Sequence, residues 1–266
     1  MGPLRNAYLD ALGIDRWVSR NTPTDVAVPS GAGEGFPGFV SDAHSPAPLP
    51  NPGNPSPAPL PAAPLPADWK PLPPTADWGV LRERVAACTA CELCKTRTQT
   101  VFGVGNTRPD WLVIGEAPGA DEDRKGEPFV GAAGQLLNAM LLAIGLPRET
   151  VFIANILKCR PPANRDPKPE QVSRCLPYLS NQIALLQPKI ILAVGRVAAQ
   201  NLLATDAPLA RLRGKLHHFG EANTPMVITY HPAYLLRTPA DKRKTWEDLK
   251  FARATHARLA ASQGSH

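Results

Sequence analysis

Proline dominates one stretch of this 266-residue chain and limits what that stretch can fold into. Residues 21–76 hold 16 of the 31 prolines. Because proline fixes φ and lacks a backbone N–H, neither a helix nor a central strand can form at that density. We therefore expect a disordered linker, partly polyproline II, that is either a passive spacer or a ligand for a proline-binding module.

The linker divides the chain into a short leading segment and a folded domain. Residues 4–20 carry apolar side chains at helical spacing but are too few to fold alone. We expect the folded domain to span residues 77–258, followed by a tail at 259–266. Residues 1–76 hold four basic and six acidic side chains, which leaves 25 and 17 for the rest. That net charge of +8 fits a nucleic acid partner, and it also fits an ordinary basic protein.

Two kinds of segment are missing from the sequence pattern. Residues 1–20 contain no apolar core of a signal peptide, and no run of about 18 apolar residues could cross a membrane. We therefore expect a cytoplasmic protein, where disulfides are rare and clustered cysteines more often bind metal.

Short apolar runs alternate with amphipathic segments throughout the domain. This alternation predicts a parallel sheet with helices on both faces. Ligands of such sheets bind beyond the carboxyl ends of the strands. The loops that begin at Gly115, Asn155, Gly195 and His231 should therefore gather at one edge. The expected strands are 111–114, 151–156, 189–194 and 226–229, and the expected helices are 78–87, 134–144, 170–186 and 197–203.

The five cysteines form the first candidate site. Cys88, Cys91 and Cys94 are spaced Cys-x-x-Cys-x-x-Cys, and Cys159 and Cys175 follow further along the chain. Four thiolates can ligate zinc or an iron–sulfur cluster, and the spacing does not choose between them. Buried free thiols are the alternative.

Two loops of the first half carry further candidates. The segment GEAPGADED, residues 115–123, places several carboxylates after a strand, where they can position water or simply be solvated. In KGEPFVG, residues 125–131, Phe129 lies in a glycine-flanked turn and can stack on a base. The alternative for Phe129 is a place in the core.

Two strand ends of the second half complete the set. Asn155 has an amide that donates and accepts at once, as reading a base edge requires, although it could instead cap a helix. His231 is followed by a proline-fixed turn, and it could be a site residue or a structural one. Leu235 and Leu236 beyond it could wedge into a base stack.

Taken in order, the segments GEAPGADED, KGEPFVGAAGQLL, NILKCRPPANRDP, RGK and HPAYLLR resemble the family 4 uracil-DNA glycosylases over roughly residues 80–252. The resemblance implies a three-layer α/β/α fold with a central four-stranded parallel sheet. It also implies a [4Fe–4S] cluster held by Cys88, Cys91, Cys159 and Cys175. Cys94 falls where the family pattern needs no ligand.

The same resemblance implies excision of uracil that is flipped out of DNA, which leaves an abasic site for base-excision repair. Phe129 would stack on the uracil. Asn155 would read its O4/N3 edge and so reject cytosine, and His231 would hydrogen-bond O2 of the leaving uracilate.

Further residues follow from the matched motifs. Glu116 and Glu122 would orient water or stabilise the sugar cation, and the resemblance does not say which of them dominates. The backbone near Ala117 would line the pocket, and Asn164 would lie near the sugar or phosphate.

DNA contacts are expected from the two last motifs. Arg213, Lys215 and Arg237 would contact phosphates, which gives affinity without sequence preference. Leu235 or Leu236 would be the wedge.

Residues 4–20 resemble the peptide with the pattern LGI-x-x-W at the start of the clamp-loader psi subunit, which docks on the chi subunit. We therefore interpret residues 1–20 as a docking peptide for a replication protein, on a monomer associated with the nucleoid. Three alternatives stay open. They are a uracil- or single-strand-binding protein without turnover, a redox iron–sulfur or zinc protein, and a glycosylase that traps DNA covalently through His217 or His218.

Overall fold

The computed structural model describes residues 73–263, so the predictions for residues 1–20 and for the linker up to residue 72 lie outside the described residues. The packed domain begins slightly earlier than predicted. The backbone N–H of Thr75 donates to Oδ1 of Asn181 at 2.9 Å, and Nδ2 of Asn181 donates to the carbonyl of Thr75 at 2.9 Å. Arg84 also donates to the carbonyl of Pro73 at 2.7 Å. Residues 73–76 therefore belong to the domain and not to the linker.

One sheet of six strands forms the centre of the described residues, in the order β1-β3-β2-β4-β6-β5. The four inner strands pair in parallel, which confirms the predicted four-stranded parallel sheet. Two short edge strands, β1 and β5, add antiparallel pairs that the sequence did not predict. The strands are β1 (Val104–Gly105), β2 (Trp111–Gly115), β3 (Phe152–Asn155), β4 (Ile190–Val194), β5 (His217–Phe219) and β6 (Thr224–Thr229).

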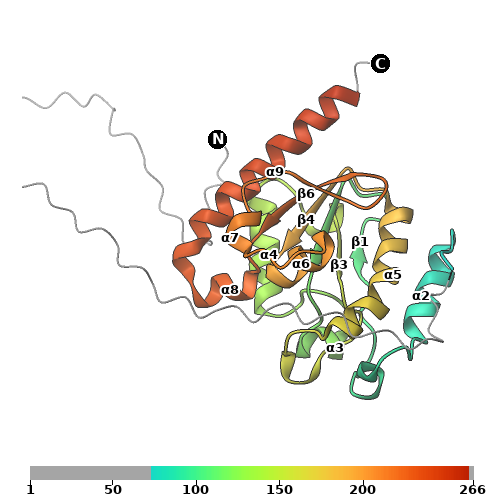
Figure 1. The fold of residues 1–266 in the computed structure, drawn as a ribbon. Helices are drawn as coiled ribbons and strands as arrows, with labels where there is room; N and C mark the ends of the chain where they lie inside the picture. The colour runs from blue at the N-terminus through green and yellow to red at the C-terminus, as the bar shows by residue number, and fades with distance from the viewer. Residues whose placement is uncertain (1–72, 264–266) are drawn as a thin grey trace, which may run out of the picture. The chain divides into compact units, whose positions relative to one another are not determined.

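Helices cover both faces of this sheet, as Figure 1 shows. Successive side chains of a strand point to opposite faces. On β2, Leu112 and Ile114 therefore join one core, and Trp111 and Val113 join the other. The first core is closed by α2 (Trp78–Ala86), α5 (Pro169–Leu186), α6 (Arg196–Leu203) and α7 (Leu209–Leu212). The second is closed by α4 (Ala132–Ala143), α8 (Pro232–Arg237) and α9 (Lys242–Gln263).

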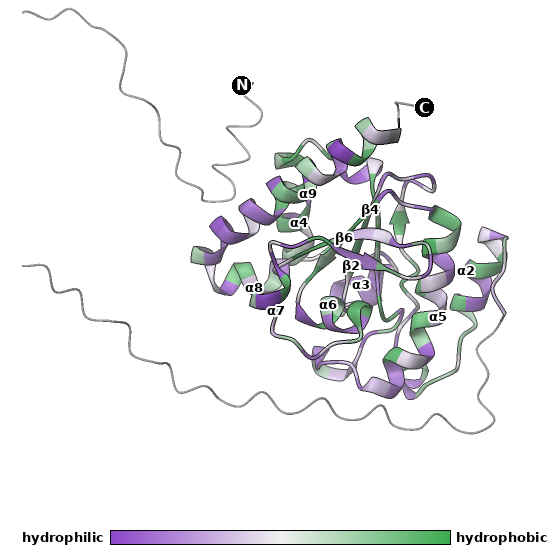
Figure 2. Cartoon of the chain, turned by 45° about the horizontal axis from the view of Figure 1, so that its top comes forward, coloured by the Kyte–Doolittle hydropathy of each residue, from purple (hydrophilic) through white to green (hydrophobic). Residues whose placement is uncertain are grey.

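The last helix corrects the predicted domain end. Helix α9 runs to Gln263, so residues 259–263 continue a helix where a tail was predicted. Its hydrophilic and hydrophobic residues alternate along the ribbon in Figure 2. Buried Leu249 and Ala252 attach it to the second core. Within residues 73–263, none of the helices combines the length and apolar character needed to cross a membrane.

The strand order creates a binding edge. The chain passes from β2 to β3 on one side and later returns as β4 on the other side of β2. Such a reversal opens a crevice beyond the carboxyl ends of the strands. The short elements of the described residues are α3 (Ala120–Lys125) and the 3₁₀ helices η1 (Glu92–Lys95), η2 (Arg148–Thr150), η3 (Pro162–Asn164) and η4 (Pro239–Asp241).

Candidate active site

A cavity of about 550 Å³ lies beyond the carboxyl ends of the parallel strands. Residues 116–122 reach it from the end of β2, Asn155 from the end of β3, and His231 from the end of β6. Three of the four loops predicted to gather at this edge therefore line the cavity. The fourth lies beside them, since a Cβ at Gly195 would be 2.9 Å from Cβ of His231. The lining of the cavity includes the predicted site residues Glu116, Ala117, Glu122, Phe129, Asn155, Asn164, His231 and Arg237.

Asn155 presents a polar group without a partner. The residue is 2% exposed, and its Oδ1 is buried with no hydrogen-bond partner among the described residues. Its own carbonyl accepts a hydrogen bond from Nζ of Lys158 at 2.8 Å, which fixes the strand end. A Cβ at Gly115 would lie 2.4 Å from Oδ1 of Asn155, so β2 must end in glycine here. A buried acceptor without a donor is costly unless a ligand supplies one.

Phe129 forms one wall of the cavity in an unusual backbone conformation. Its φ is 54°, a region that aromatic residues rarely occupy. Its ring centroid is 5.6 Å from that of His231, and the two planes are inclined by 30°. A Cβ at Gly134 would lie 1.9 Å from the carbonyl oxygen of Phe129, so α4 can approach this turn only through a glycine.

Glu122 holds the Phe129 turn from the cavity side. Its Oε1 accepts from the backbone N–H of Val130 at 2.9 Å and of Gly131 at 3.1 Å. Its Oε2 accepts from the N–H of Gly119 at 3.1 Å. Both carboxylate oxygens are therefore engaged with the backbone, which gives Glu122 a role in loop geometry.

His231 has a defined tautomer. It caps α8, and its Nδ1 accepts from the backbone N–H of Ala233 at 3.1 Å. In the neutral ring the proton then lies on Nε2. Burial and the charge of Arg237 lower the pKa of His231 to about 4, while Glu122 acts in the opposite direction. The imidazole is therefore a neutral hydrogen-bond donor near pH 7.

Glu116 is a carboxylate of this cavity whose charged form is destabilised by its surroundings. Burial, followed by the negative charge of Asp166, raises the pKa of Glu116 to about 7, and Arg196 lowers it. Asp166 and Arg196 form an ion pair at 2.5 Å at the rim. A carboxyl group that titrates near neutrality suits acid–base work.

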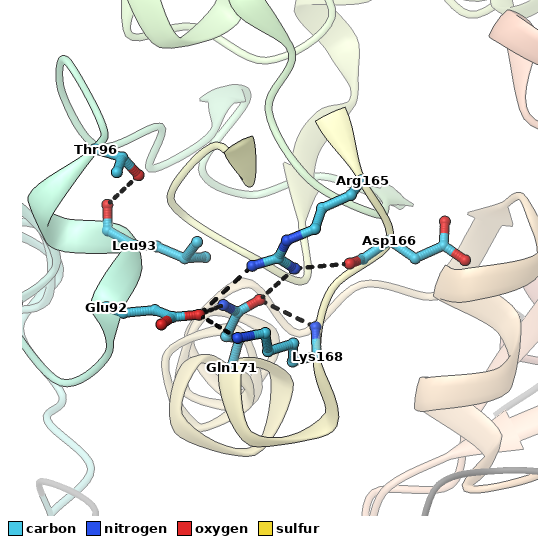
Figure 3. A network of polar contacts seen from close by, with 7 residues as sticks. All are labelled: Glu92, Leu93, Thr96, Arg165, Asp166, Lys168 and Gln171. Carbon is cyan, nitrogen blue, oxygen red and sulfur yellow. Dashed lines mark hydrogen bonds and ion pairs between the residues drawn. The ribbon is translucent and has the colours of Figure 1, made fainter. Parts of the chain in front are cut away.

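The rim segment that follows Asn164 is tied to the cysteine segment by the polar network in Figure 3. Oε1 of Glu92 accepts from Nζ of Lys168 at 2.8 Å and from Nε2 of Gln171 at 2.9 Å. The guanidinium of Arg165 lies 3.6 Å from the same oxygen. Asn164 itself accepts from Nε of Arg160 at 2.8 Å. The rim therefore depends on a residue that lies between Cys91 and Cys94.

Two of the predicted DNA contacts, Arg213 and Leu235, have side chains that are packed inside the domain. Nε of Arg213 donates to Asp248 at 2.7 Å, its guanidinium lies 4.2 Å from the Tyr230 ring, and its side chain is only 12% exposed. This buried ion pair engages the charge that a phosphate would need. Leu235 is 1% exposed within the second core and cannot act as a wedge.

The other predicted DNA contacts lie at the surface. Leu236 is 46% exposed, so it is the leucine of the pair that can reach a base stack. Lys215 and Arg237 are also exposed, and Arg237 lines the cavity. Nε2 of His217 donates to the carbonyl of Leu212 at 2.7 Å, and His218 is exposed on β5.

All five cysteines line a second cavity, and none forms a disulfide. Three cationic side chains surround them. Arg97 donates to Sγ of Cys159 at 3.1 Å, and Lys158 and Arg174 line the same space. Among residues 73–263, no three His, Cys, Asp or Glu side chains are arranged to hold a single metal ion.

The contacts of Lys158 indicate what kind of group the cysteine cavity could hold. Its side chain is 1% exposed, and Nζ donates to two neutral oxygens, the carbonyl of Asn155 and Oε1 of Gln182. Its backbone N–H donates to Sγ of Cys175 at 3.2 Å. A buried ammonium ion is costly without an anion nearby. The thiols and cations together fit an anionic thiolate-ligated group.

Sequence reasoning missed three residues that shape these sites. Lys158 follows the Asn155 strand end, and its position within NILKCRPP was the available signal. Asp166 belongs to the same motif, but its effect on Glu116 depends on a spatial approach. Arg148 supports the Phe129 turn from a different part of the chain, and no pattern pointed to it.

The fold and the site together define a class. The uracil DNA glycosylase superfamily matches residues 102–250, more than half of the chain. The chain is also 45% identical over 177 residues to a type-4 uracil-DNA glycosylase of Archaeoglobus fulgidus, which covers 64% of this chain and 88% of that protein. The chain belongs to the type-4 uracil-DNA glycosylase family.

Two further relatives agree. A type-4 uracil-DNA glycosylase of Pyrobaculum aerophilum is 43% identical over 175 residues, which covers 64% of this chain and 89% of the relative. One of Sulfurisphaera tokodaii is 39% identical over 180 residues, with 65% and 82% covered.

Proposed function

We propose that this enzyme accepts a uracil flipped out of DNA into the cavity beside Phe129 and hydrolyses its N-glycosidic bond. The products are free uracil and an abasic site for base-excision repair. Family membership and the arrangement of Asn155, Phe129 and His231 support this activity. We call this space the uracil cavity.

The observation that carries the proposal is the unpartnered Oδ1 of Asn155. The N3–H of uracil is a donor and its O4 is an acceptor, so one amide can satisfy both atoms. Cytosine presents a bare N3 and an amino group at these positions, which reverses the pattern. An amide held in one orientation therefore accepts uracil and leaves cytosine with unpaired polar atoms, a large penalty in a buried site.

Catalysis requires a stabilised leaving group. As the bond to the sugar breaks, negative charge grows on the uracil ring, and Nε2–H of His231 can donate to O2. Because the pKa of His231 is about 4, this donor is neutral and already in place at neutral pH. A preorganised donor of this kind is worth about 10²–10³ in rate.

Of the two carboxylates, we propose that Glu116 is the one that activates the attacking water. Its pKa near 7 keeps an ionised fraction that can accept a proton from water or face the sugar cation. Glu122, with both oxygens on backbone N–H groups, keeps the Phe129 turn and the Gly119 loop in position.

We further propose that Cys88, Cys91, Cys159 and Cys175 hold a [4Fe–4S] cluster. Thiolates are the ligands such a cluster takes, and four of them leave it with net negative charge that the surrounding cations can balance. When bound, the cluster supplies covalent cross-links between the segment of Cys88 and that of Cys159 and Cys175. Cys94 also lines the cavity and is assigned no ligand role.

For DNA binding we propose Lys215 and Arg237 as phosphate contacts and Leu236 as the wedge. All three side chains are exposed. Asn164 at the rim is assigned to the sugar or phosphate of the flipped nucleotide.

Release of uracil is the test. A labelled oligonucleotide with one deoxyuridine is incubated with cluster-loaded enzyme beside strands that carry cytosine or thymine at that position. We expect free uracil and an alkali-sensitive site in the first strand only. Tight binding without release would instead establish the uracil-binding protein, and a covalent adduct would establish the trapping glycosylase.

The docking peptide at residues 1–20 and the linker remain proposals, because they lie outside the described residues. A tether raises the local concentration of an enzyme near its second partner. A peptide of residues 1–20 should capture a replication protein, and equal capture by the W17A peptide would contradict this proposal. The cytoplasmic location and the monomeric state also stay predictions.

A further inference from the structure

The turn that carries Phe129 is held in a conformation that the residue does not favour by itself. Its φ of 54° is left-handed, and such backbone persists only where the surroundings hold it. Phe129 is followed by Val130 and Gly131, whose N–H groups donate to Glu122. Those contacts come from the cavity side, and they hold only the peptide groups that follow Phe129.

Arg148 holds the turn from outside the cavity. Its guanidinium donates to the carbonyl of Pro128 at 2.6 Å and to the carbonyl of Phe129 at 3.3 Å. The same group is oriented by Oδ1 of Asn138 at 3.0 Å and by Oε1 of Glu127 at 3.0 Å. The side chain is 21% exposed, and it does not line the uracil cavity.

These contacts fix both peptide planes that flank Phe129. The peptide group after Phe129 has its oxygen on Arg148 and its N–H, from Val130, on Glu122. The peptide group before Phe129 has its oxygen on Arg148 as well. With both planes anchored, φ and ψ of Phe129 are set, and so is the direction of the Cα–Cβ bond that carries its ring. A lysine would replace this contact only in part, because its ammonium lacks the planar fork of donors that also reaches Asn138 and Glu127.

We propose that Arg148 is a positioning residue for uracil recognition, acting through the backbone of Phe129. The inference rests on the proposed function, since it takes the Phe129 ring to stack on uracil. It assigns no contact with substrate to Arg148. A ring that is free to tilt would stack less often on the flipped base, so the fraction of bound complexes ready to react would fall.

A double-mutant cycle tests this role. We expect R148M to lower kcat/KM for uracil release by about tenfold, within the coupling typical of residues in contact. R148K, which keeps the charge but not the fork, should recover only part of the loss. In the F129A background, R148M should change kcat/KM by less than about twofold, because the ring on which it acts is gone.

Two controls separate positioning from general stability. K189M removes an exposed ion pair, 2.9 Å to Asp110, near the start of β4 and should leave kcat/KM unchanged. Melting temperature and visible cluster absorbance are recorded for every variant, and any fall in melting temperature with R148M should be the same in both backgrounds. If R148M does not fold, the same cycle is run with R148K.

The outcomes distinguish the positioning role of Arg148 from the proposed glycosylase function. Equal losses in the Phe129 and F129A backgrounds, or wild-type activity of both Arg148 variants, would overturn the positioning role alone. A wild-type enzyme that releases no uracil would overturn the proposed function and this inference with it.

Discussion

The uracil cavity and the cysteine cavity are joined by five residues of chain, Asn155 to Cys159, yet their polar groups are arranged in opposite ways. In the uracil cavity, the amide oxygen of Asn155 has no partner among the described residues, and the pKa of Glu116 is raised. In the cysteine cavity, cations face the thiols, and Arg97 donates directly to Cys159. Polar groups without a partner suit a substrate that binds and leaves. Groups with permanent counter-charges suit a cofactor that stays bound.

Lys158 belongs to both regions. Its Nζ holds the carbonyl of Asn155, and its backbone N–H donates to Cys175. The Glu92 network makes a second connection, from the cysteine segment to the rim at Arg165 (Figure 3). Substitutions in the uracil cavity should therefore affect uracil release alone, and substitutions in the cysteine cavity should affect cluster binding. Substitutions at the connecting residues Lys158 and Glu92 should affect both.

The largest expected effect concerns chemistry alone. H231A should lower kcat for uracil release by about 10²–10³, because a preorganised donor to the leaving group is lost. Iron content and melting temperature should stay near wild type. H218A, which removes an exposed histidine of β5, is the matched control and should keep full activity. Loss of activity in H218A with retention in H231A would reverse the assignment.

The next effect concerns assembly. C175S should lose bound iron and lower the melting temperature by about 10 °C, since a cofactor bound only by the folded state contributes its binding energy to folding. C94S should keep the iron and the visible spectrum. Iron analysis and thermal melts of both variants measure this, and equal iron loss would make Cys94 a ligand.

Lys158 should give an intermediate result that links the two regions. We expect K158M to lower the excision rate about tenfold, as the loss of a buried hydrogen bond to a charged group implies, and to change the cluster absorbance or reduction potential as well. Single-turnover rates and a redox titration on the same preparation measure both. A variant altered in only one of the two properties would show that Lys158 does not link them.

The smallest effect is a shift in pH dependence. If Glu116 acts as the ionised base, kcat should rise with pH through about 7. D166N removes the negative charge that raises the pKa of Glu116, so the rise should move to lower pH. R196Q removes the positive charge that lowers it, so the rise should move to higher pH. Profiles of single-turnover rate between about pH 5 and 9 would show these shifts. Movement in the same direction for both variants would contradict the role of Glu116.

The parallel core could be predicted because fully buried strands appear as continuous apolar runs. The edge strands β1 and β5 could not, since runs of two and three residues become strands only through their neighbours. Asn155 and His231 were predictable as strand ends. The ion pair of Arg213 could not be predicted, because its partner Asp248 lies 35 residues further on.

Two adjacent leucines also could not be told apart from the sequence. Leu235 and Leu236 are equivalent in sequence, and only the packing of α8 buries one and exposes the other. Arg148 could not be predicted either, because its acceptors are carbonyl groups, which every residue carries.

The most direct test of the account compares uracil with cytosine in wild type and in N155D. An ionised aspartate offers only acceptors, which repel O4 of uracil and match the amino group of cytosine. We predict that the wild type releases uracil and no cytosine, and that N155D loses most of its uracil release, so that the ratio of uracil to cytosine release falls by at least about 10², as expected for a buried hydrogen-bonding site. An unchanged ratio in N155D would contradict the claim that Asn155 reads the base.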